Sequence, residues 1–80
     1  MHIPLQYRES GVPGWHDART VNISRTGILV GADEAVGPES KLDIRLHFPL
    51  KVTISCQGSI VRSEEKAFAV RIHRYRLHRI

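Results

Sequence analysis

Hydrophobic and polar residues alternate along most of this chain, which is the pattern of β-strands with one buried side and one solvent-facing side. The clearest run covers residues 41–48, and the same period of two occurs over residues 3–7, 21–23, 51–62 and 68–72. The positions predicted to point inward are Ile3, Leu5, Tyr7, Val21, Ile23, Leu42, Ile44, Leu46, Phe48, Val52, Ile54, Cys56, Ile60, Phe68, Val70 and Ile72.

Turn-forming residues separate these runs. Gly, Pro, Ser or charged residues fill segments 10–14, 24–27, 31–40, 48–50 and 63–66. They divide the chain into short strands that recur roughly every 8–14 residues, and such spacing predicts an all-β barrel or sandwich. A barrel suits so small a chain, because closure removes the exposed edges of a sheet.

A few positions depart from simple alternation. Gly58 takes an inward place in the fifth run and predicts a bulge or a sharp coil of the sheet there. Helix signals are sparse: residues 33–36 could form one turn, and residues 74–80 could either begin a helix or extend the last strand. With no repeat and no linker, residues 1–80 are expected to form a single domain with little helix.

The composition agrees with a small cytoplasmic protein. The chain has 80 residues, and no apolar run approaches the roughly 18 residues of a membrane helix. Its first residues lack the basic and apolar segments of a secretory signal. Cys56 is the only cysteine, so no internal disulfide can form, whereas small secreted domains usually contain several.

The charge of the chain favours an anionic partner. Its formal net charge is +4, and arginines crowd the C-terminal end at Arg71, Arg74, Arg76 and Arg79. Nucleic acid, a nucleotide, a phospholipid headgroup or an acidic protein surface would each suit this imbalance. The alternative is a basic tail that is simply solvated.

Neither a catalytic site nor a metal site is predicted. The five histidines have no paired spacing of the kind that zinc sites use, and His47 and His73 fall on the solvent-facing side of their strands. Ser24 has no histidine near it in sequence, and Cys56 is expected to be a small core residue. The sequence therefore predicts a binding module with no cofactor and not an enzyme.

The aromatic residues bear on nucleic-acid binding. Tyr7, Phe48 and Phe68 are assigned inward, whereas single-strand binders need exposed rings on their strands, so nucleic acid is not the expected partner. Trp15 in the first loop is expected to be exposed or half-buried at a barrel rim. It could be a contact anchor or a lid over a thin core, and both alternatives stay open.

The chemistry of ligand binding gathers in residues 20–30. Asn22 offers an amide donor and acceptor for a purine edge, and Ser24 adds a hydroxyl at the strand end. Arg25 could reach a phosphate, and Gly27 allows a positive φ and a close approach of ligand to the backbone. The alternative is a plain turn, in which Asn22 and Ser24 satisfy nearby backbone groups.

This segment resembles the second signature of PilZ domains, an Asp/Asn-x-Ser-x-x-Gly turn that leads into an apolar strand. The resemblance extends to the Ile-Pro-Leu strand at residues 3–5, to residues 58–62 and to residues 68–72, and so covers nearly the whole chain. It implies a six-stranded antiparallel β-barrel of the split-barrel type. It also implies binding of cyclic di-GMP, a bacterial second messenger, with Asn22, Ser24, Arg25 and Gly27 at the ligand.

One element of the family pattern differs. Members that bind cyclic di-GMP have an Arg-x-x-x-Arg signature shortly before the first strand, whereas Arg8 and Arg19 are the only arginines before Asn22 in this sequence. Arg8 stands at the far end of the first strand and is not expected to replace that signature. Three explanations stay open: the sequence was cut just downstream of the signature, its start was misjudged, or this member has lost the signature. A degenerate PilZ domain that binds an effector protein and no nucleotide is therefore the alternative function.

Overall fold

The computed structural model describes residues 3–32 and 41–79, and all regular secondary structure in them is β-strand. The strands are β1 (Pro4–Glu9), β2 (His16–Ile23), β3 (Gly27–Gly31), β4 (Lys41–Phe48), β5 (Val52–Glu64) and β6 (Ala67–Arg79). The predicted six strands are confirmed, and the C-terminal segment extends β6 instead of starting a helix. The possible turn at residues 33–36 lies outside the described residues. No helix that could cross a membrane occurs in the described part of the chain.

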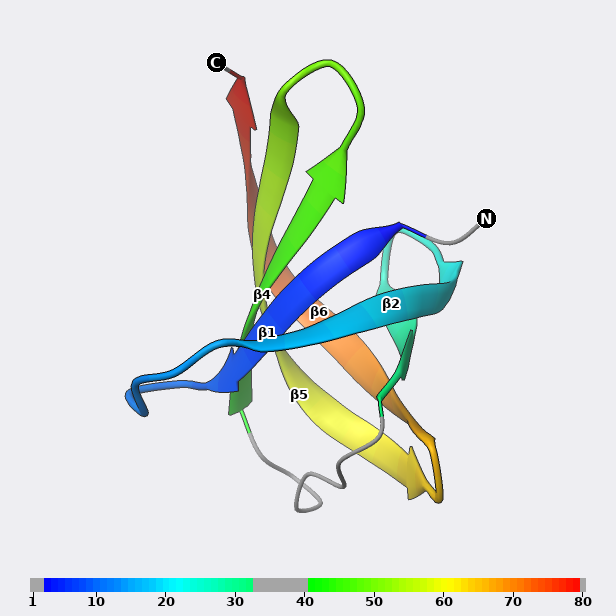
Figure 1. The fold of residues 1–80 in the computed structure, drawn as a ribbon. Coiled ribbons are helices and arrows are strands. Elements are labelled where there is room, and N and C mark those ends of the chain that lie inside the picture. The colour runs from blue at the N-terminus through cyan, green and yellow to red at the C-terminus, as the bar shows by residue number, and fades with distance from the viewer. Residues whose placement is uncertain (1–2, 33–40, 80) are drawn as a thin grey trace.

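The six strands close into an antiparallel barrel in the order β1-β2-β3-β6-β5-β4, as predicted. Strand β1 completes the closure because it pairs with β2 on one side and with β4 on the other, so that Leu5 lies opposite both Ala18 and Leu46. Figure 1 shows β1 and β2 crossing in front of the long strands β4, β5 and β6.

The apolar positions of the alternating pattern fill the barrel. Phe68 is fully buried, and its ring meets the ring of Tyr7 edge-on at 5.2 Å between centroids. Around this pair lie the other buried hydrophobic residues Ile3, Leu5, Ile28, Val30, Ala32, Leu42, Ile44, Leu46, Cys56, Ile60 and Val70. Alternation thus identified most of the core, because every second side chain of a strand points to the same face.

Strand β2 differs from its prediction. Val21 was expected to point inward, but its side chain is 42% exposed, whereas its neighbour Thr20 is fully buried. A bulge causes the difference: Thr20 lies opposite Val30 and Asn22 lies opposite Leu29, which leaves Val21 as the extra residue. The bulge turns Asn22 outward and allows Ile23 to pack against the core.

Strands β5 and β6 form a long ribbon of 13 residues each, and Gly58 shapes it. Gly58 lies opposite Ile72 while Gln57 lies opposite Arg74, so His73 is an extra residue and the predicted bulge is confirmed. A side chain at residue 58 would collide with the Arg71 carbonyl oxygen and lie 2.7 Å from Val70 Cγ1. Glycine is required here because β6 crosses too closely for a Cβ atom.

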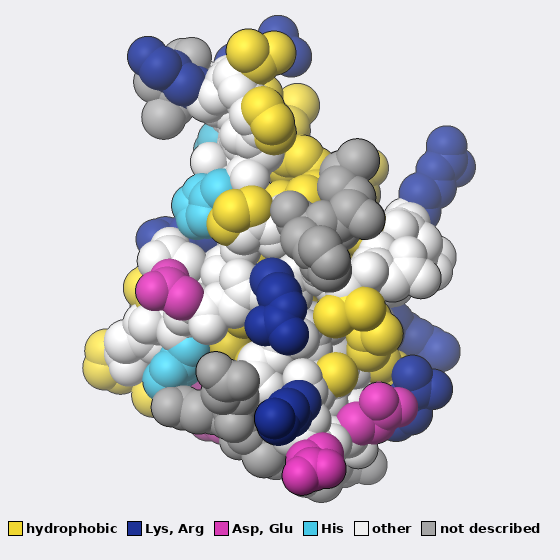
Figure 2. All heavy atoms as spheres, turned by 45° about the vertical axis from the view of Figure 1, so that its right-hand side comes forward, with side chains coloured by type: hydrophobic (Ala, Val, Ile, Leu, Met, Phe, Trp, Pro, Cys, Tyr) yellow, Lys and Arg dark blue, Asp and Glu magenta, His cyan; other side chains and the backbone are white. Residues whose placement is uncertain are grey.

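One end of this ribbon extends past the barrel together with β4. Residues 74–79 of β6 pair with β5 alone, since β3 pairs with β6 only as far as Arg71. Figure 2 shows hydrophobic side chains at the surface of this upper end. Leu50 and Leu77, which belong to this end of the ribbon, are exposed. The projecting ribbon therefore has two accessible faces, an apolar one and the polar one described below.

Candidate ligand-binding site

The turn between β2 and β3 is held by its own side chains. The Ser24 amide donates to the Gly27 carbonyl oxygen at 2.9 Å. The Ser24 hydroxyl donates to the same oxygen and accepts from the Gly27 amide, both at 3.3 Å. Asn22 Oδ1 accepts a hydrogen bond from the Ile23 amide at 2.9 Å. The predicted plain-turn role of Asn22 and Ser24 is therefore present in the structure.

These local bonds leave donors on the outer surface. The side-chain nitrogen of Asn22 has no protein partner among residues 3–32 and 41–79, and the side chain is exposed. An outward amide that keeps two N–H groups can donate to a carbonyl or a ring nitrogen of a ligand. The β2 bulge places it there, because without the extra residue Asn22 would face the core.

Gly27 is needed for a reason other than the predicted one. Within the described part of the chain, only Gly11 and Gly14 among the glycines have a positive φ, so the expected positive φ at Gly27 is wrong. A Cβ atom at residue 27 would instead lie 3.0 Å from the carbonyl oxygen of Val70. The Thr26 carbonyl oxygen accepts from the Ile72 amide at 2.9 Å, which fixes the turn against β6.

A shallow groove of about 330 Å³ begins at this turn. Asn22, Ser24 and Gly27 line it, whereas Arg25 is exposed but lies outside the lining. The remaining lining residues are Ile23, Thr26, Ile28, Leu29, Val61, Arg62, Ala69, Val70 and Arg71. The structure thus brings three of the four predicted site residues together and adds residues from β5 and β6.

Two of the added residues are arginines that sequence reasoning did not place at the site. Arg71 lies directly opposite Gly27 across the β3–β6 pair, and Arg62 lines the groove from β5. Arg62 pairs with Glu64 at 3.2 Å, whereas Arg71 has no carboxylate partner in the described chain. The signal for Arg71 was its outward position between the inward Val70 and Ile72, but only the register shows that it faces the turn.

Comparison with models of known families shows to which family the chain belongs. The model of the PilZ domain matches residues 1–79. The chain belongs to the PilZ domain family. PilZ domains are binding and regulatory modules generally associated with cyclic di-GMP. No curated protein and no solved structure matches this chain significantly.

Arg8 of this PilZ domain lies on a different surface. Its Nε donates to Asp43 Oδ2 at 3.1 Å on neighbouring β4, and its guanidinium lies 4.5 Å from the centre of the Trp15 ring. The groove at the β2–β3 turn does not include it. Arg8 therefore lies outside the groove at the β2–β3 turn, and whether another residue takes the role of the first signature stays a prediction.

The other titratable candidates do not converge on the groove. Cys56 is buried and free, and burial raises the pKa of its thiol, which keeps it protonated and unreactive. His47 and His73 are exposed as predicted, and His73 shares a 2.7 Å hydrogen bond with Ser59. Among the described residues, no group of three or more histidine, cysteine or acidic side chains could hold a metal ion.

Proposed function

We propose that this PilZ domain binds cyclic di-GMP at the groove beside the β2–β3 turn. Asn22, Ser24 and Gly27 would form one wall, with Arg25 reaching over it, and Arg71 would supply a cation from the opposite strand. The observation that supports the proposal most is the position of Arg71, an arginine without a carboxylate partner in the described chain, directly across from Gly27. A guanidinium can bind a phosphate in bidentate fashion and can stack on a guanine ring.

The proposal describes a regulatory binding module in the cytoplasm and not an enzyme. Upstream arginines of the Arg-x-x-x-Arg type would form the second wall in a longer chain. The printed sequence has no such pair before Asn22. The alternative is a PilZ domain that binds an effector protein without nucleotide.

Calorimetric titration with cyclic di-GMP tests the proposal. The 80-residue chain and a longer chain with any upstream arginines are compared, and we expect heat of binding from at least one. Asn22→Ala and Arg71→Gln should each weaken binding about tenfold, because each removes a hydrogen bond to a charged or polar ligand group. Lys66→Gln in the β5–β6 turn is the matched control, since it removes the same charge outside the groove.

Two outcomes would overturn the proposal. The first is that neither chain gives heat of binding at roughly 50 μM ligand, a concentration that would detect a binding free energy near −6 kcal/mol. The second is that Arg71→Gln binds cyclic di-GMP no more weakly than the control Lys66→Gln does. A pull-down that recovers the same protein with and without cyclic di-GMP would then support the effector-binding alternative.

A further inference from the structure

The outer face of the projecting ribbon contains a second groove, of about 380 Å³, on strands that do not contribute the β2–β3 turn. We propose that this groove binds the phosphate group of a phosphorylated ligand between Arg45 and Arg76, over the hydroxyl of Ser55. The site is separate from the cyclic di-GMP groove, because the two grooves share no lining residue.

The register of three neighbouring strands builds this site. Arg45 of β4 lies opposite Ser55 of β5, and Ser55 lies opposite Arg76 of β6, so the three side chains form one row on one face. Strands are about 4.8 Å apart, which separates the two arginine backbones by about 10 Å with a small residue between them. Ser55 thus forms the floor of a trough, and the arginines form its walls.

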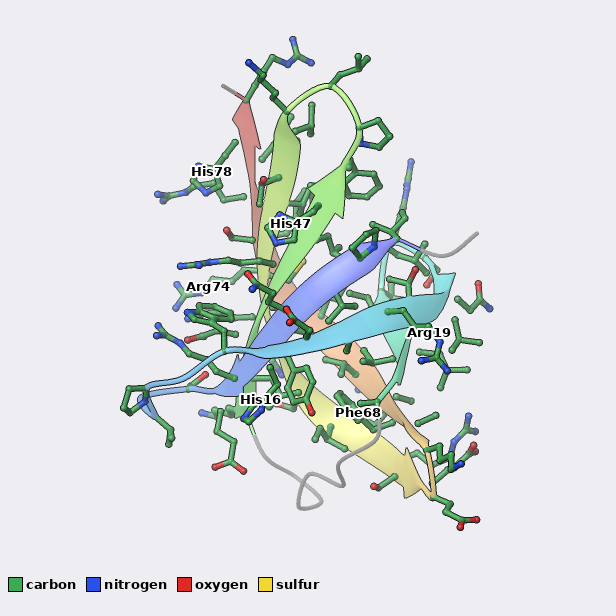
Figure 3. All side chains as sticks on the ribbon, in the orientation of Figure 1. His16, Arg19, His47, Phe68, Arg74 and His78 are labelled. Atoms are coloured by element: carbon green, nitrogen blue, oxygen red, sulfur yellow. The ribbon has the colours of Figure 1, made fainter. Side chains whose placement is uncertain are left out.

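One of the two neighbouring rows repeats this arrangement. His47, Thr53 and His78 form the next row toward the end of the ribbon, again with a small hydroxyl residue between two larger basic ones. In Figure 3, Arg74 and His78 project from β6 to the same side of the ribbon, and His47 lies on neighbouring β4. The trough therefore has basic side chains on both banks from the Arg45–Arg76 row to the His47–His78 row, whereas the row on its other side contains Asp43, Gln57 and Arg74.

The acid in this surface is already neutralised. Asp43 accepts hydrogen bonds from Arg8 at 3.1 Å, from Ser10 at 3.0 Å and from Gln57 at 3.2 Å. Arg74 donates to Gln57. These contacts occupy Asp43, the only carboxylate among the described residues that line the groove. Arg45 and Arg76 have no acidic partner among residues 3–32 and 41–79.

The geometry favours a tetrahedral oxyanion over a planar carboxylate. With Arg45 turned from Trp15 toward Ser55, donors would approach from three directions: one guanidinium from each bank and one hydroxyl from the floor. A carboxylate has two oxygens in one plane and is satisfied by a single arginine fork, whereas a phosphate presents three oxygens that can each meet one of these donors. A phosphate monoester, which presents three terminal oxygens, is therefore the expected ligand group.

Trp15 reports on this site. It is the only tryptophan of the chain, and the Arg45 guanidinium lies 4.0 Å from the centre of its ring. A phosphate that draws Arg45 toward Ser55 would weaken this cation–π contact. Binding is therefore expected to change the tryptophan emission.

The test is a titration followed by Trp15 emission and by calorimetry at low ionic strength. The probes are AMP, inorganic phosphate, vesicles of phosphatidic acid and, as the carboxylate comparison, malonate. We expect Arg45→Gln and Arg76→Gln each to weaken binding of AMP or inorganic phosphate about tenfold or more, since each removes a charge-assisted hydrogen bond. Lys66→Gln, which changes the net charge equally, should shift affinity less than about twofold.

Each result decides the proposal. Binding of AMP or inorganic phosphate that both arginine variants weaken supports a site for free phosphorylated molecules. Binding confined to phosphatidic acid vesicles, with the same loss in both variants, supports a lipid phosphate headgroup. Three results would overturn it. Malonate could bind as tightly as the phosphate probes, Lys66→Gln could lose as much affinity as the arginine variants, or no phosphate probe could bind. Arg76→Gln leaves the Trp15 contact intact, so its loss of binding cannot be attributed to that contact.

Discussion

At the scale of single residues, Thr20 shows how one polar group is accommodated in an apolar barrel. Its side chain is fully buried, and its hydroxyl accepts a hydrogen bond from the Ile3 amide at 2.8 Å. The Thr20 amide donates in return to the Ile3 carbonyl oxygen at 3.0 Å. These bonds attach the start of the chain to β2 beyond the last pair of the β1–β2 ladder, Pro4 with Arg19.

Thr20→Val is predicted to lower the free energy of unfolding by about 1–3 kcal/mol, because it leaves the buried Ile3 amide without its side-chain acceptor. Thr20→Ser is the matched control: it keeps the hydroxyl and loses one methyl group, at a cost of about 1 kcal/mol. Urea unfolding of both variants measures the difference. A Thr20→Val protein as stable as the parent would show that the hydroxyl contributes nothing.

The carboxyl group of Asp43 ties stability to pH. Burial acts to raise its pKa, but hydrogen bonds from Arg8, Ser10 and Gln57, together with the charge of Arg8, outweigh burial and hold the pKa below its ordinary value of 3.8. The folded state therefore binds this proton less readily than the unfolded state. The stabilisation is fully present above the ordinary pKa and is lost as the pH falls through the folded-state pKa.

Asp43→Asn should accordingly lower the free energy of unfolding by about 1 kcal/mol at neutral pH. The difference from the parent protein should shrink as the pH falls below about 4 and vanish at lower pH. Denaturant unfolding across this range measures it, with exposed Glu65→Gln as the control. A difference that stays constant with pH would contradict this account.

At the scale of the elements, the β5–β6 ribbon depends on Gly58. The residue lets β6 cross close to β5 and places the bulge at His73, which sets which side chains of residues 74–79 face the phosphate groove. A one-residue change of register would move Arg76 to the opposite face of the ribbon. The groove therefore relies on the backbone geometry at Gly58, which directly follows the lining residue Gln57 on β5.

Gly58→Ala is predicted to destabilise the protein by about 1–3 kcal/mol, because the new methyl group would meet the Arg71 carbonyl and Val70. Exposed Ser63→Ala in the same strand is the control and should cost less than about 0.5 kcal/mol. Thermal unfolding followed by circular dichroism compares them. Equal melting temperatures of the two variants would show that the crossing can relax at no cost.

Strand boundaries and the facing of side chains could be predicted where the alternation was unbroken, and the prediction failed where a bulge interrupted it. Strand β4 begins and ends where the sequence pattern does, at residues 41–48. In strand β2 the prediction failed at Val21, because the bulge breaks the alternation there: Thr20 before it and Ile23 after it both face the core. A β-branched apolar residue next to a threonine gives no local sign of which of the two points inward.

At the scale of the whole molecule, the barrel depends on a thin core. Phe68 is among the largest fully buried side chains and contacts Tyr7 on the first strand, so it joins the two ends of the sequence. A domain of this size has little surplus stability, because it buries a smaller fraction of its surface than a larger one. The loss of one large core side chain should therefore affect the fold as a whole.

Phe68→Ala should cost about 3–5 kcal/mol and bring the protein close to global unfolding at room temperature. Leu77→Ala, at a side chain 54% exposed on the projecting ribbon, should cost less than about 1 kcal/mol. Thermal melts and amide hydrogen exchange measure both. Retention of a cooperative melt near that of the parent in Phe68→Ala would show that the core is not limiting.

The candidate sites were predictable only in part. The turn at Asn22, Ser24 and Gly27 could be identified because its residues are consecutive, and a local motif needs no knowledge of neighbours. Arg71 lies far from that turn in sequence and reaches it through strand pairing. Trp15 is half-buried, which agrees with its expected exposure, but only the structure shows that it lies against Arg8 and Arg45.

The sequence by itself determined the strands, most of the core residues, the bulge at Gly58 and the turn beside the first groove, because each depends on residues that are near neighbours along the chain. The tertiary structure alone decided the bulge at Val21 and the face on which Arg45, Ser55 and Arg76 meet. The physical reason is register. Alternation states that every second residue shares a face, but only the pairing of strands states which residues of different strands lie side by side.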